Sequence, residues 1–586
     1  MCSIIGYTGR FGAASVLIGS LKRMEYRGYD SVGMATIESS KILVRKDVGK
    51  VLEVEKSLQL DDMPGQIGIG HTRWATHGSI NKINAHPHTD CKNNIVVVHN
   101  GIIDNYKQLK IELQKKGHRF RSETDSEVIA HLIESYYSKH NDVKLAIIDT
   151  CRRLKGSYAF VVIFKSGLVA GVRQDEPLII GLGKDGNFIS SDVLGFLEYT
   201  DRSIFLDNQD IVILNENNVH IYDFNGNPVS RAVTQVAWEL GDIDKGKYAH
   251  YTHKEIHEQQ HSIQRAFGIK EEQINKFIDI ISKSKNIFIT GSGTSYHCAM
   301  LAKYLLNKLS DIRTEIVMSS EFEYMSGLLD ENSVLIAISQ SGETADVLHA
   351  VKIAKQKNAK ILTIVNIPTS SLARFSDHYI TINCGPEIGV AATKSFTGQL
   401  AIIYSIVNRL SSTKLDTNFS NFTNIVKKVL VLEPHIEKIA EEIKKTKDIY
   451  ILGKSLHYPI GLEGSLKIKE LAYIHAEGIA AGEIKHGPLA LIENNTVVIV
   501  LNPSDDTYTD TLNSVYEMKS RGATIIGISD QNNEIYDYFI QLPKIDNLLY
   551  PIIEIIPLQI LSYYLALKNN ANPDYPRNLA KSVTVR

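Results

Sequence analysis

The chain has 586 residues, of which 43% are hydrophobic and 22% are charged, so it can bury sizeable cores and is not largely disordered. At roughly 100–200 residues per domain, this length excludes a single small module. Lysine and arginine number 64 against 66 aspartates and glutamates, with no block rich in basic residues. This balance argues against a nucleic acid or a membrane surface as the partner.

The cysteines and the apolar segments bear on the compartment. The chain begins without a basic region ahead of its apolar residues, which argues against a secretory signal. The most apolar window, 548–567, contains two prolines, a glutamate and a glutamine, and we expect a buried helix there rather than a membrane span. Five cysteines without C-x-x-C spacing are typical of a reducing, cytoplasmic compartment: Cys2, Cys91, Cys151, Cys298 and Cys384.

The first part of the chain, residues 1–240, has the pattern of an α+β layered domain. Alternating apolar residues predict strands and hairpins, and a helical period follows Asp125. The predicted strands and hairpins lie at 65–73, 94–103, 157–165 and 205–224, and the predicted helix covers 125–137.

The pattern changes after about Trp238. A polar segment, 241–275, is expected to be a linker, and strands then alternate with helices. Apolar strand patterns near 287, 334, 361 and 379 recur about 160 residues later, near 449, 497, 524 and 538. We therefore expect two doubly wound α/β domains, 276–425 and 426–575, followed by a tail at 576–586.

Cys2 is a candidate nucleophile. Removal of Met1 would place a free α-amino group on the residue that carries the thiol, and this amine can act as the general base. An amidase acting on glutamine also needs a cation, an anion and oxyanion donors, which Arg73, Asp125 and Asn100 with the Gly101 N–H can supply. An ordinary cysteine at position 2 is the alternative for Cys2 taken alone.

These residues lie in the motifs YRGYDS, HTRWATHG, HNGIIDN and SETDSE at 26–31, 71–78, 99–105 and 122–127. The motifs resemble the N-terminal-nucleophile glutaminase domain of the class II glutamine amidotransferases. The resemblance implies a γ-glutamyl thioester on Cys2 and an oxyanion hole at Asn100 and Gly101. It assigns glutamine binding to Arg73, Thr76, His77 and Asp125, and it makes Trp74 an ammonia gate. The family usually begins Cys-Gly-Ile, whereas this chain has Ser3.

A second group of residues resembles a metal cluster only superficially. His86, His88, Asp90 and Cys91 are close in sequence, but H-x-H alone is a weak signal and a second ligand pair with the usual spacing is missing. We expect a loop without a metal at this segment.

Two turns predict a phosphosugar site. TGSGTSYHC at 290–298 and SQSGETADV at 339–347 each follow an apolar strand and open a helix, where backbone N–H groups favour a phosphate. Helix N-capping alone is one alternative for these hydroxyls, and a dinucleotide site is another, although the third glycine of G-x-G-x-x-G is absent. The candidate phosphosugar ligands are Thr294, Ser295, Ser339, Gln340, Ser341 and Thr344.

These turns resemble the sugar isomerase fold, and the whole chain resembles the amidotransferases that aminate fructose 6-phosphate. The resemblance implies synthesis of glucosamine 6-phosphate from glutamine and fructose 6-phosphate, in a homodimer, without metal or nucleotide. It assigns sugar contacts to Val390, Lys467 and Ala580. It further gives acid/base roles to Glu470 and to His486 of the neighbouring subunit, and an imine to Lys581. The alternatives are another class II glutamine amidotransferase, such as one fused to a phosphoribosyltransferase, and a non-enzymatic phosphosugar sensor.

Overall fold

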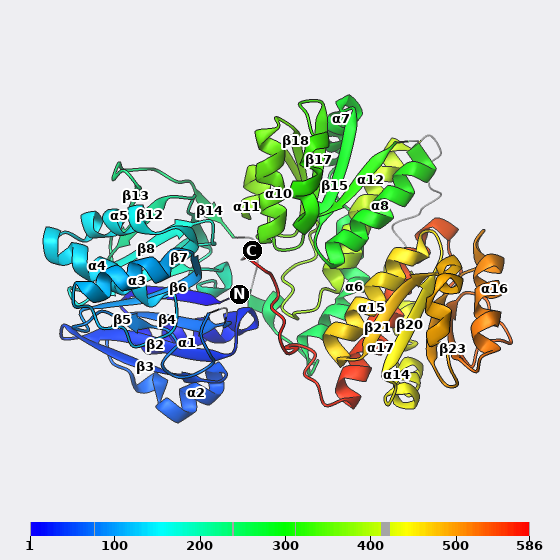
Figure 1. Ribbon diagram of the computed structural model, residues 1–586, viewed down its shortest axis with the longest axis horizontal. Helices are drawn as coiled ribbons and strands as arrows, with labels where there is room; N and C mark the ends of the chain where they lie inside the picture. Colours follow the sequence, from blue (N-terminus) through cyan, green and yellow to red (C-terminus); the bar gives the residue numbers. More distant parts are fainter. Residues whose placement is uncertain (1, 76, 237–239, 311, 412–421, 585–586) are drawn as a thin grey trace. The chain divides into compact units, whose positions relative to one another are not determined.

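The computed structural model describes the chain except for residues 1, 76, 237–239, 311, 412–421 and 585–586. Two compact units are present. One comprises Met1–Asp242 with Ala580–Arg586, and the other comprises Ile243–Leu579. In Figure 1 the part of the first unit up to Asp242 runs from blue to teal, and Ile243–Leu579 runs from green to red.

Two antiparallel sheets lie at the centre of the first unit (Figure 1). The eight-stranded sheet has the order β14-β11-β9-β10-β1-β4-β2-β3, and the six-stranded sheet has the order β13-β12-β8-β7-β6-β5. The first sheet contains β1 (Ser3–Gly9), β2 (Ser31–Glu38), β3 (Lys41–Val48), β4 (Ile67–Arg73), β9 (Ile179–Leu182), β10 (Gly186–Ser190), β11 (Arg202–Phe205) and β14 (Val233–Gln235). The second contains β5 (His88–Thr89), β6 (Ile95–Ile103), β7 (Gly156–Phe164), β8 (Val169–Gln174), β12 (Asp210–Leu214) and β13 (Val219–Asp223).

The alternation of apolar residues in β6 shows how the layers form. Val96 and Val98 pack in one cluster with residues of β1 and β4, between the two sheets. Ile95 and Val97 point to the opposite face and pack with residues of the helices α4 and α5. The predicted layered α+β domain is therefore confirmed. Its helices are α1 (Ala13–Met24), α2 (Val51–Leu58), α3 (Tyr106–Lys115), α4 (Glu127–His140) and α5 (Val143–Arg153).

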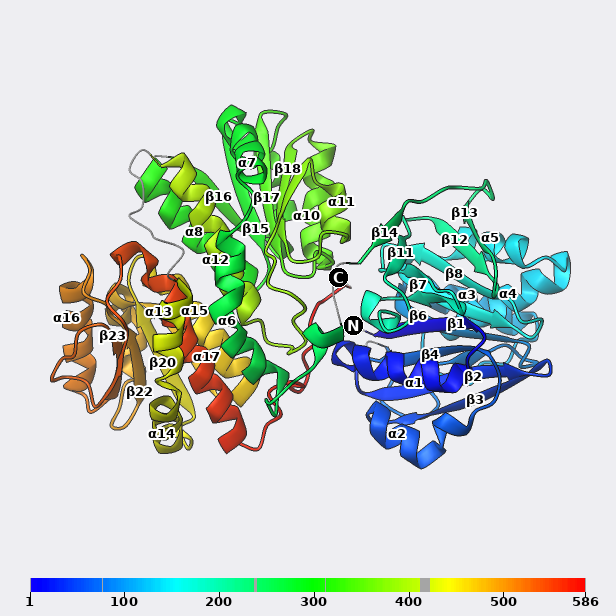
Figure 2. The same cartoon turned by 180° about the vertical axis from the view of Figure 1, so that it is seen from behind.

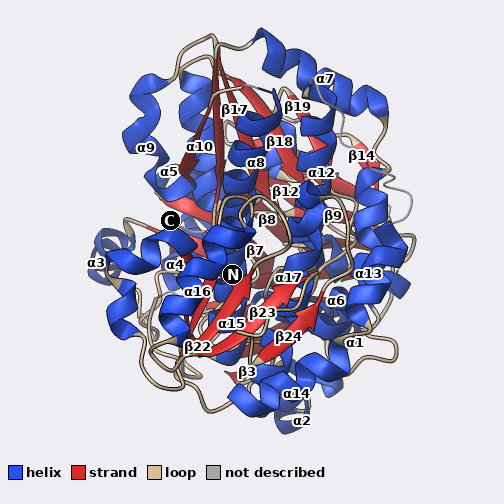
Figure 3. Ribbon diagram, turned by 90° about the vertical axis from the view of Figure 1, so that its right-hand side faces the viewer, coloured by secondary structure: helices blue, strands red, loops and turns tan. Residues whose placement is uncertain are grey.

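The second unit contains two parallel five-stranded sheets, with the orders β16-β15-β17-β18-β19 and β21-β20-β22-β23-β24. Helices surround the strands of both (Figure 3). The first sheet contains β15 (Asn286–Gly291), β16 (Thr314–Met318), β17 (Ser333–Ser339), β18 (Lys360–Val365) and β19 (His378–Thr381). The second contains β20 (Asp448–Gly453), β21 (His475–Ala480), β22 (Val497–Leu501), β23 (Thr524–Ser529) and β24 (Tyr538–Gln541). The helices are α6 (Tyr251–Phe267), α7 (Glu271–Lys283), α8 (Thr294–Ser310), α9 (Phe322–Met325), α10 (Ala345–Gln356), α11 (Ser371–Phe375), α12 (Lys394–Leu410), α13 (Phe422–Leu430), α14 (Glu433–Ile443), α15 (His457–Ala472), α16 (Tyr508–Lys519) and α17 (Tyr550–Lys568).

The two sheets have the same topology, which confirms the predicted doubly wound repeat. All eight strands of the predicted repeat are present. Each sheet has one further strand, β16 or β21, at equivalent edges beside β15 and β20. The sequence does not predict these two strands because neither is a continuous apolar run. β16 is partly exposed, and β21 includes the exposed His475 and Glu477.

Within the range 241–275, expected to be a linker, the structure has the helix α6. Ile256, Ile263 and Ala266 of this helix are buried in the main core of the second unit. α6 packs against α12, as Figure 2 shows. The buried side chains recur at helical spacing on one face, and the polar residues of the same segment conceal this pattern.

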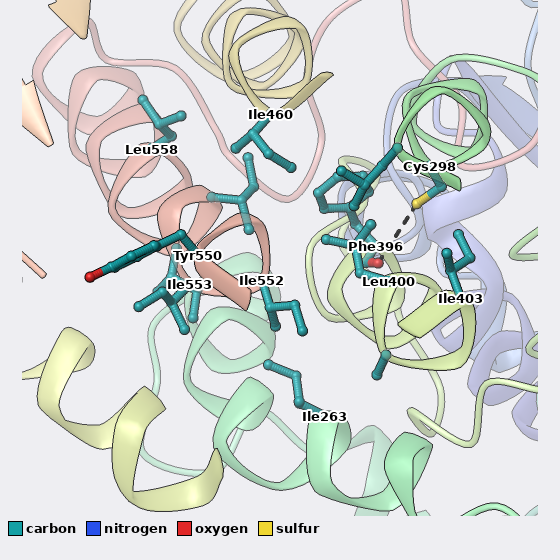
Figure 4. Close-up of a cluster of buried hydrophobic side chains, with 14 of the residues drawn as sticks. Ile263, Cys298, Phe396, Leu400, Ile403, Ile460, Tyr550, Ile552, Ile553 and Leu558 are labelled. Atoms are coloured by element: carbon teal, nitrogen blue, oxygen red, sulfur yellow. Dashed lines mark hydrogen bonds between the residues drawn. The ribbon is translucent and has the colours of Figure 1, made fainter. Parts of the chain in front are cut away.

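The core of the second unit joins residues from both sheets' helices. Phe396 and Leu400 of α12 lie close to Cys298 of α8, while Ile460 of α15 and Ile552 of α17 belong to the same cluster (Figure 4). The two halves of this unit therefore share one hydrophobic core.

The apolar window near the C-terminus forms α17. The segment Asn547–Lys568 is long and apolar enough to cross a membrane, but 89% of its most apolar window is buried within the structure. Pro557 lies inside the helix, and Glu554 is fully buried there. This burial agrees with the expectation of a core helix.

Candidate active site

Cys2 lies immediately before β1 and is half-buried. The backbone N–H of Trp74, directly after β4, donates to Cys2 Sγ over 3.1 Å. Burial raises the pKa of the Cys2 thiol, and the Trp74 N–H and the Arg73 guanidinium oppose this rise. Pairing of β1 with β4 brings the two segments together, with Ser3 opposite Thr72. The Ser3 hydroxyl donates to Met24 O over 2.8 Å, so the chain accommodates this departure from Cys-Gly-Ile.

Asn100 and Gly101 lie near Cys2 on β6. Asn100 Nδ2 donates to Cys2 O over 3.0 Å, and Asn100 Oδ1 lies 3.1 Å from His71 Nε2. Gly101 has φ +109, and a Cβ there would lie 2.0 Å from Ser157 O. Only glycine fits this backbone. The amide side chain of Asn100 therefore lies beside the thiol-bearing residue, and the next residue of the strand is a glycine that the fold requires.

Arg73 and Asp125 are both buried in the first unit. Arg73 contacts the carbonyl oxygens of the loop that follows β4, including Ser79 O at 3.4 Å and His77 O. Burial lowers the pKa of Arg73, and the nearby Cys2, Asp30 and Asp125 act in the opposite direction. The first unit therefore contains a buried guanidinium and a buried carboxylate, the two charges that recognition of an amino acid requires.

The rest of the predicted glutamine site is described only in part. Asp125 Oδ2 accepts from Ile103 N over 2.8 Å. The His77 ring lies edge-on to Tyr106, and the Trp74 ring lies edge-on to Tyr29. Thr76 lies outside the described residues.

The segment with His86, His88 and Asp90 has structural contacts of its own. His86 Nδ1 accepts from His99 N over 3.2 Å, and His88 Nε2 lies 3.1 Å from Thr124 Oγ1. Asp90 Oδ1 accepts from Asn94 N over 2.7 Å and so closes the turn before β6. Burial lowers the pKa of His86 and His88 well below the ordinary value. These contacts support turn and packing roles for the three residues.

The two hydroxyl-rich turns lie at the carboxyl ends of β15 and β17. Ser339 Oγ lies 3.1 Å from Thr344 Oγ1, accepts from Gly342 N over 3.1 Å, and is buried. Thr344 is the N-cap residue of α10, but its side chain makes no capping hydrogen bond. Capping by the Thr344 hydroxyl therefore does not account for this residue. Gln340 lies in the same turn and accepts from Asn366 N through its carbonyl oxygen.

The turn before α8 meets α15 from the other half of the unit. Thr294 Oγ1 donates to the fully buried Glu463 Oε1 over 2.9 Å. Lys467 Nζ lies 3.3 Å from Glu463 and 2.5 Å from Glu470 Oε2. Burial would lower the pKa of Lys467, but the two carboxylates raise it, so the ammonium persists. A cation and a carboxylate thus lie beside the turn predicted to bind the phosphosugar.

The remaining predicted residues occupy separate positions. Ser295 Oγ accepts from Gln399 Nε2 over 3.1 Å, and Val390 is buried with its N–H 3.4 Å from Asp574 O. His486 is exposed at the end of a 3-10 helix, Ala481–His486. Ala580 and Lys581 group with the first unit.

Models of two domain families match the chain. The glutamine amidotransferase domain matches residues 71–196, and the SIS domain matches residues 280–409 and 442–568. An aminotransferase of Pyrococcus horikoshii, named glutamine–fructose-6-phosphate aminotransferase [isomerizing], is 44% identical over all of both chains. An Aquifex aeolicus protein of the same name is 43% identical, again over the full length of both.

The chain belongs to the isomerizing glutamine–fructose-6-phosphate aminotransferase family. A solved structure, the C-terminal domain of such an aminotransferase from Francisella tularensis, is 32% identical with a TM-score of 0.52 and covers 56% of this chain and 99% of that one. Tagatose-6-phosphate ketose/aldose isomerase from Escherichia coli, at 20% identity and a TM-score of 0.50, covers 57% of this chain and 96% of its own and shows the fold alone.

The structure adds site residues to those predicted for this aminotransferase-family chain. Asp30 Oδ2 accepts from Ala75 N over 2.9 Å and fixes the segment after Trp74. Glu463 accepts from Thr294 and also lies 2.7 Å from His297 Nδ1. Asp30 lies inside the motif at 26–31, but no local pattern distinguishes Asp30 or Glu463 from the surrounding charged residues.

Proposed function

We propose that the chain makes glucosamine 6-phosphate and glutamate from fructose 6-phosphate and glutamine. The observation that carries this proposal is the presence, in one chain, of two distinct reactive groups. Cys2 lies under the Trp74 N–H beside Asn100, and the Lys467–Glu470 pair lies beside the hydroxyl-rich turn at Thr294. Each group matches the chemistry that its family domain requires.

The first step of the proposed reaction takes place at Cys2. The free α-amino group accepts the thiol proton, and Sγ attacks the glutamine amide carbon to form a tetrahedral oxyanion. Donors from Asn100 and Gly101 stabilise that oxyanion. Ammonia leaves with a proton from the amine, and water then hydrolyses the thioester to glutamate. We assign binding of the substrate's carboxylate to Arg73 and of its ammonium to Asp125, with Thr76 and His77 beside them.

The second step takes place in the repeat unit. Phosphate binding is assigned to Ser339, Gln340, Ser341 and Thr344 with Thr294 and Ser295. Lys581 forms an imine with the open-chain ketose and releases water, and ammonia displaces the lysine. Glu470 then moves a proton between C1 and C2, which completes the change from ketose to aldose. Lys467 holds the Glu470 carboxylate, and Val390 and Ala580 line the sugar.

Three further features of the proposal follow from this chemistry. Ammonia would be protonated in bulk water, so we infer internal transfer between the two sites, with Trp74 as the gate. His486 is exposed, which supports an acid/base role for it in the sugar site of a partner subunit, and hence a homodimer. Five free cysteines and the buried α17 support a cytoplasmic location. The reaction as proposed uses neither metal nor nucleotide.

The test is incubation with fructose 6-phosphate and amide-¹⁵N-labelled glutamine, followed by mass analysis of the sugar. We expect ¹⁵N in glucosamine 6-phosphate, and none when the Cys2→Ala variant replaces the wild type. Glutamine hydrolysis that needs magnesium and a diphosphosugar would instead identify a phosphoribosyltransferase fusion. Sugar binding without any turnover would identify a phosphosugar sensor. Either outcome would refute the proposal.

A further inference from the structure

Four side chains of the kinds that bind transition metals meet in the first unit, away from Cys2. They come from three separate segments: the turn between β5 and β6, the loop after α3, and the helix α4. We propose that Cys91, His118, His131 and Glu134 bind one zinc ion. Neither the glutaminase nor the sugar chemistry uses these residues.

The distances within the group fit a zinc ligand shell. Cys91 Sγ lies 3.7 Å from His118 Nδ1 and 3.6 Å from His131 Nδ1. Glu134 Oε2 lies 2.8 Å from His118 Nδ1 and 3.4 Å from His131 Nδ1. Ligands bound to tetrahedral zinc at about 2.0–2.3 Å are about 3.3–3.6 Å from one another. Of the four distances, 3.6 and 3.4 Å fall in this range, and 3.7 Å is slightly longer. The fourth, 2.8 Å, is a hydrogen-bond distance that a metal would widen.

Surrounding groups orient the ligands. The Arg119 N–H points to Cys91 Sγ at 3.5 Å, and the Cys91 N–H donates to Glu134 Oε2 over 3.3 Å. On the far side of the His131 ring, Nε2 lies 3.6 Å from Glu127 Oε1. A carboxylate behind a histidine fixes the ring and raises its basicity as a ligand. His131 is 1% exposed, so its position is set by packing as well.

The donor set selects the metal. One thiolate, two imidazoles and one carboxylate suit zinc, whereas magnesium and calcium prefer oxygen ligands alone. Binding replaces the Cys91 S–H bond by a Zn–S bond, and the proton passes to solvent. Because all four positions are filled by the protein, the site is structural rather than catalytic.

The location suggests what the metal would stabilise. His118 and His131 flank the segment 119–130, which contains Asp125, the residue assigned to the glutamine ammonium. A metal joining both flanks to Cys91 would restrict this segment.

A second group, His253, His257 and Glu433, differs because each histidine lies against a different oxygen of the same carboxylate, at 2.6 and 2.9 Å. That arrangement is explained by hydrogen bonding alone.

The experiment is a Co²⁺ titration of the full-length protein after treatment with a chelator. We expect one equivalent to bind with the visible bands of tetrahedral cobalt and a near-ultraviolet thiolate-to-cobalt band, and Zn²⁺ to displace it. Cys91→Ser should lose the near-ultraviolet band and bind at least about tenfold more weakly. Glu127→Gln should keep the spectrum and bind about 10- to 100-fold more weakly. Cys2→Ala and His257→Gln are the controls for metal binding and should give the cobalt spectrum and affinity of the wild type.

Several results would overturn the proposal. One is failure of the wild type to bind an equivalent of Co²⁺ at micromolar concentration, and another is an octahedral cobalt spectrum. A thiolate-to-cobalt band that survives Cys91→Ser, or that disappears in Cys2→Ala, would also overturn it. X-ray absorption of the zinc-loaded wild type tests the same claim without any variant. One sulfur at about 2.3 Å with nitrogen and oxygen at about 2.0 Å is expected, and a shell without sulfur would refute it.

Discussion

The environment of Cys2 shows how a single residue depends on its neighbours across the sheet. Burial raises the pKa of the thiol, which alone would make it a weaker nucleophile at neutral pH. A base on the same residue removes this difficulty, because the proton has only to move from sulfur to the α-amino group. The Trp74 N–H, 3.1 Å from Sγ, stabilises the thiolate that results.

We therefore expect Cys2→Ala to abolish glutamine hydrolysis while conversion between fructose and glucose 6-phosphates remains measurable. The physical reason is that Cys2 lies in the first compact unit, whereas Lys467, Glu470 and the hydroxyl-rich turns lie in the second. Glutamate release and sugar conversion are assayed separately on the same preparation. Retained hydrolysis would exclude Cys2 as the nucleophile, and an intact Met1 on active enzyme would exclude the amine as the base.

Ser341→Ala or Thr344→Ala should weaken phosphosugar binding about ten- to a hundredfold. Each hydrogen bond to a charged phosphate contributes about 1.5–3 kcal/mol. The Thr344 hydroxyl contacts the Ser339 hydroxyl and makes no capping bond to α10. Calorimetric titration with fructose 6-phosphate measures the change, with exposed Ser520→Ala as the control. An unchanged dissociation constant would show that these hydroxyls serve the turn alone.

Lys581 should be trapped as a covalent sugar adduct by borohydride in the presence of fructose 6-phosphate. An imine requires a neutral amine, so the lysine must enter a desolvated site during the reaction. Lys581→Arg keeps the charge but cannot form the imine, and it should lose synthase activity. Peptide mass spectrometry locates the adduct. Modification of Lys467 or Lys469 instead, or near-normal synthesis by the Arg variant, would contradict the assignment.

Sequence patterns were informative for residues that lie within short motifs and weak for residues that act through space. Cys2, Asn100 and Thr294 were each identified from local context. The partly buried contact between Thr294 and Glu463 joins positions 169 residues apart, and the packing of α8 against α15 creates it. Likewise, Cys91 was grouped with its sequence neighbours, whereas its side chain meets His118 and His131.

At the level of elements, α15 and α17 are joined by a buried histidine. His457 Nδ1 lies 2.9 Å from Glu554, and Nε2 lies 2.9 Å from Asp505. Burial alone would lower the pKa of His457, but the two carboxylates raise it to about 10. The histidine is therefore charged at neutral pH. Its ring joins Glu554 of α17 to Asp505 in the loop that follows β22.

This pair of contacts predicts a pH-dependent stability. The pKa of His457 in the folded state exceeds the unfolded value of about 6.5. Its contacts therefore contribute fully to the free energy of unfolding below that pH, and this contribution is lost as the pH rises toward 10. His457→Gln should lower the midpoint temperature of unfolding at pH 7. It should also reduce the amount by which this temperature falls between pH 7 and pH 10. Thermal unfolding at both pH values measures this, with the exposed His220→Gln as the control. An equal change of midpoint temperature between pH 7 and pH 10 in the wild type and His457→Gln would exclude His457 as the source of the pH dependence.

Strands buried on both faces were predicted reliably, because runs such as β17 and β22 consist almost wholly of apolar residues. Edge strands and amphipathic helices were harder to predict. β21 exposes His475 and Glu477, and most residues of α6 are polar, so the few buried apolar positions are easily hidden in the sequence. Tertiary packing, rather than local composition, determines those elements.

For the whole molecule, the assignment of His486 to a neighbouring subunit can be tested by mixing inactive variants. Glu470→Gln and His486→Asn, each inactive alone, should regain activity when unfolded and refolded together, because half of the sites in a mixed dimer combine intact residues. About a quarter of wild-type activity is expected from random pairing. Refolded single variants are the controls, and no recovery in a mixture shown to contain mixed dimers would place His486 in its own subunit's site.

The position of α6 determines where the sugar-converting half can be separated from the rest. A fragment starting at 276 would omit Ile256, Ile263 and Ala266 and would leave the faces of α12 and α17 that they cover exposed to water. Such a fragment should aggregate on expression. One starting at 243 retains the helix and should remain monodisperse, so the excision point for a separately folded sugar-binding half lies before α6 and not after it.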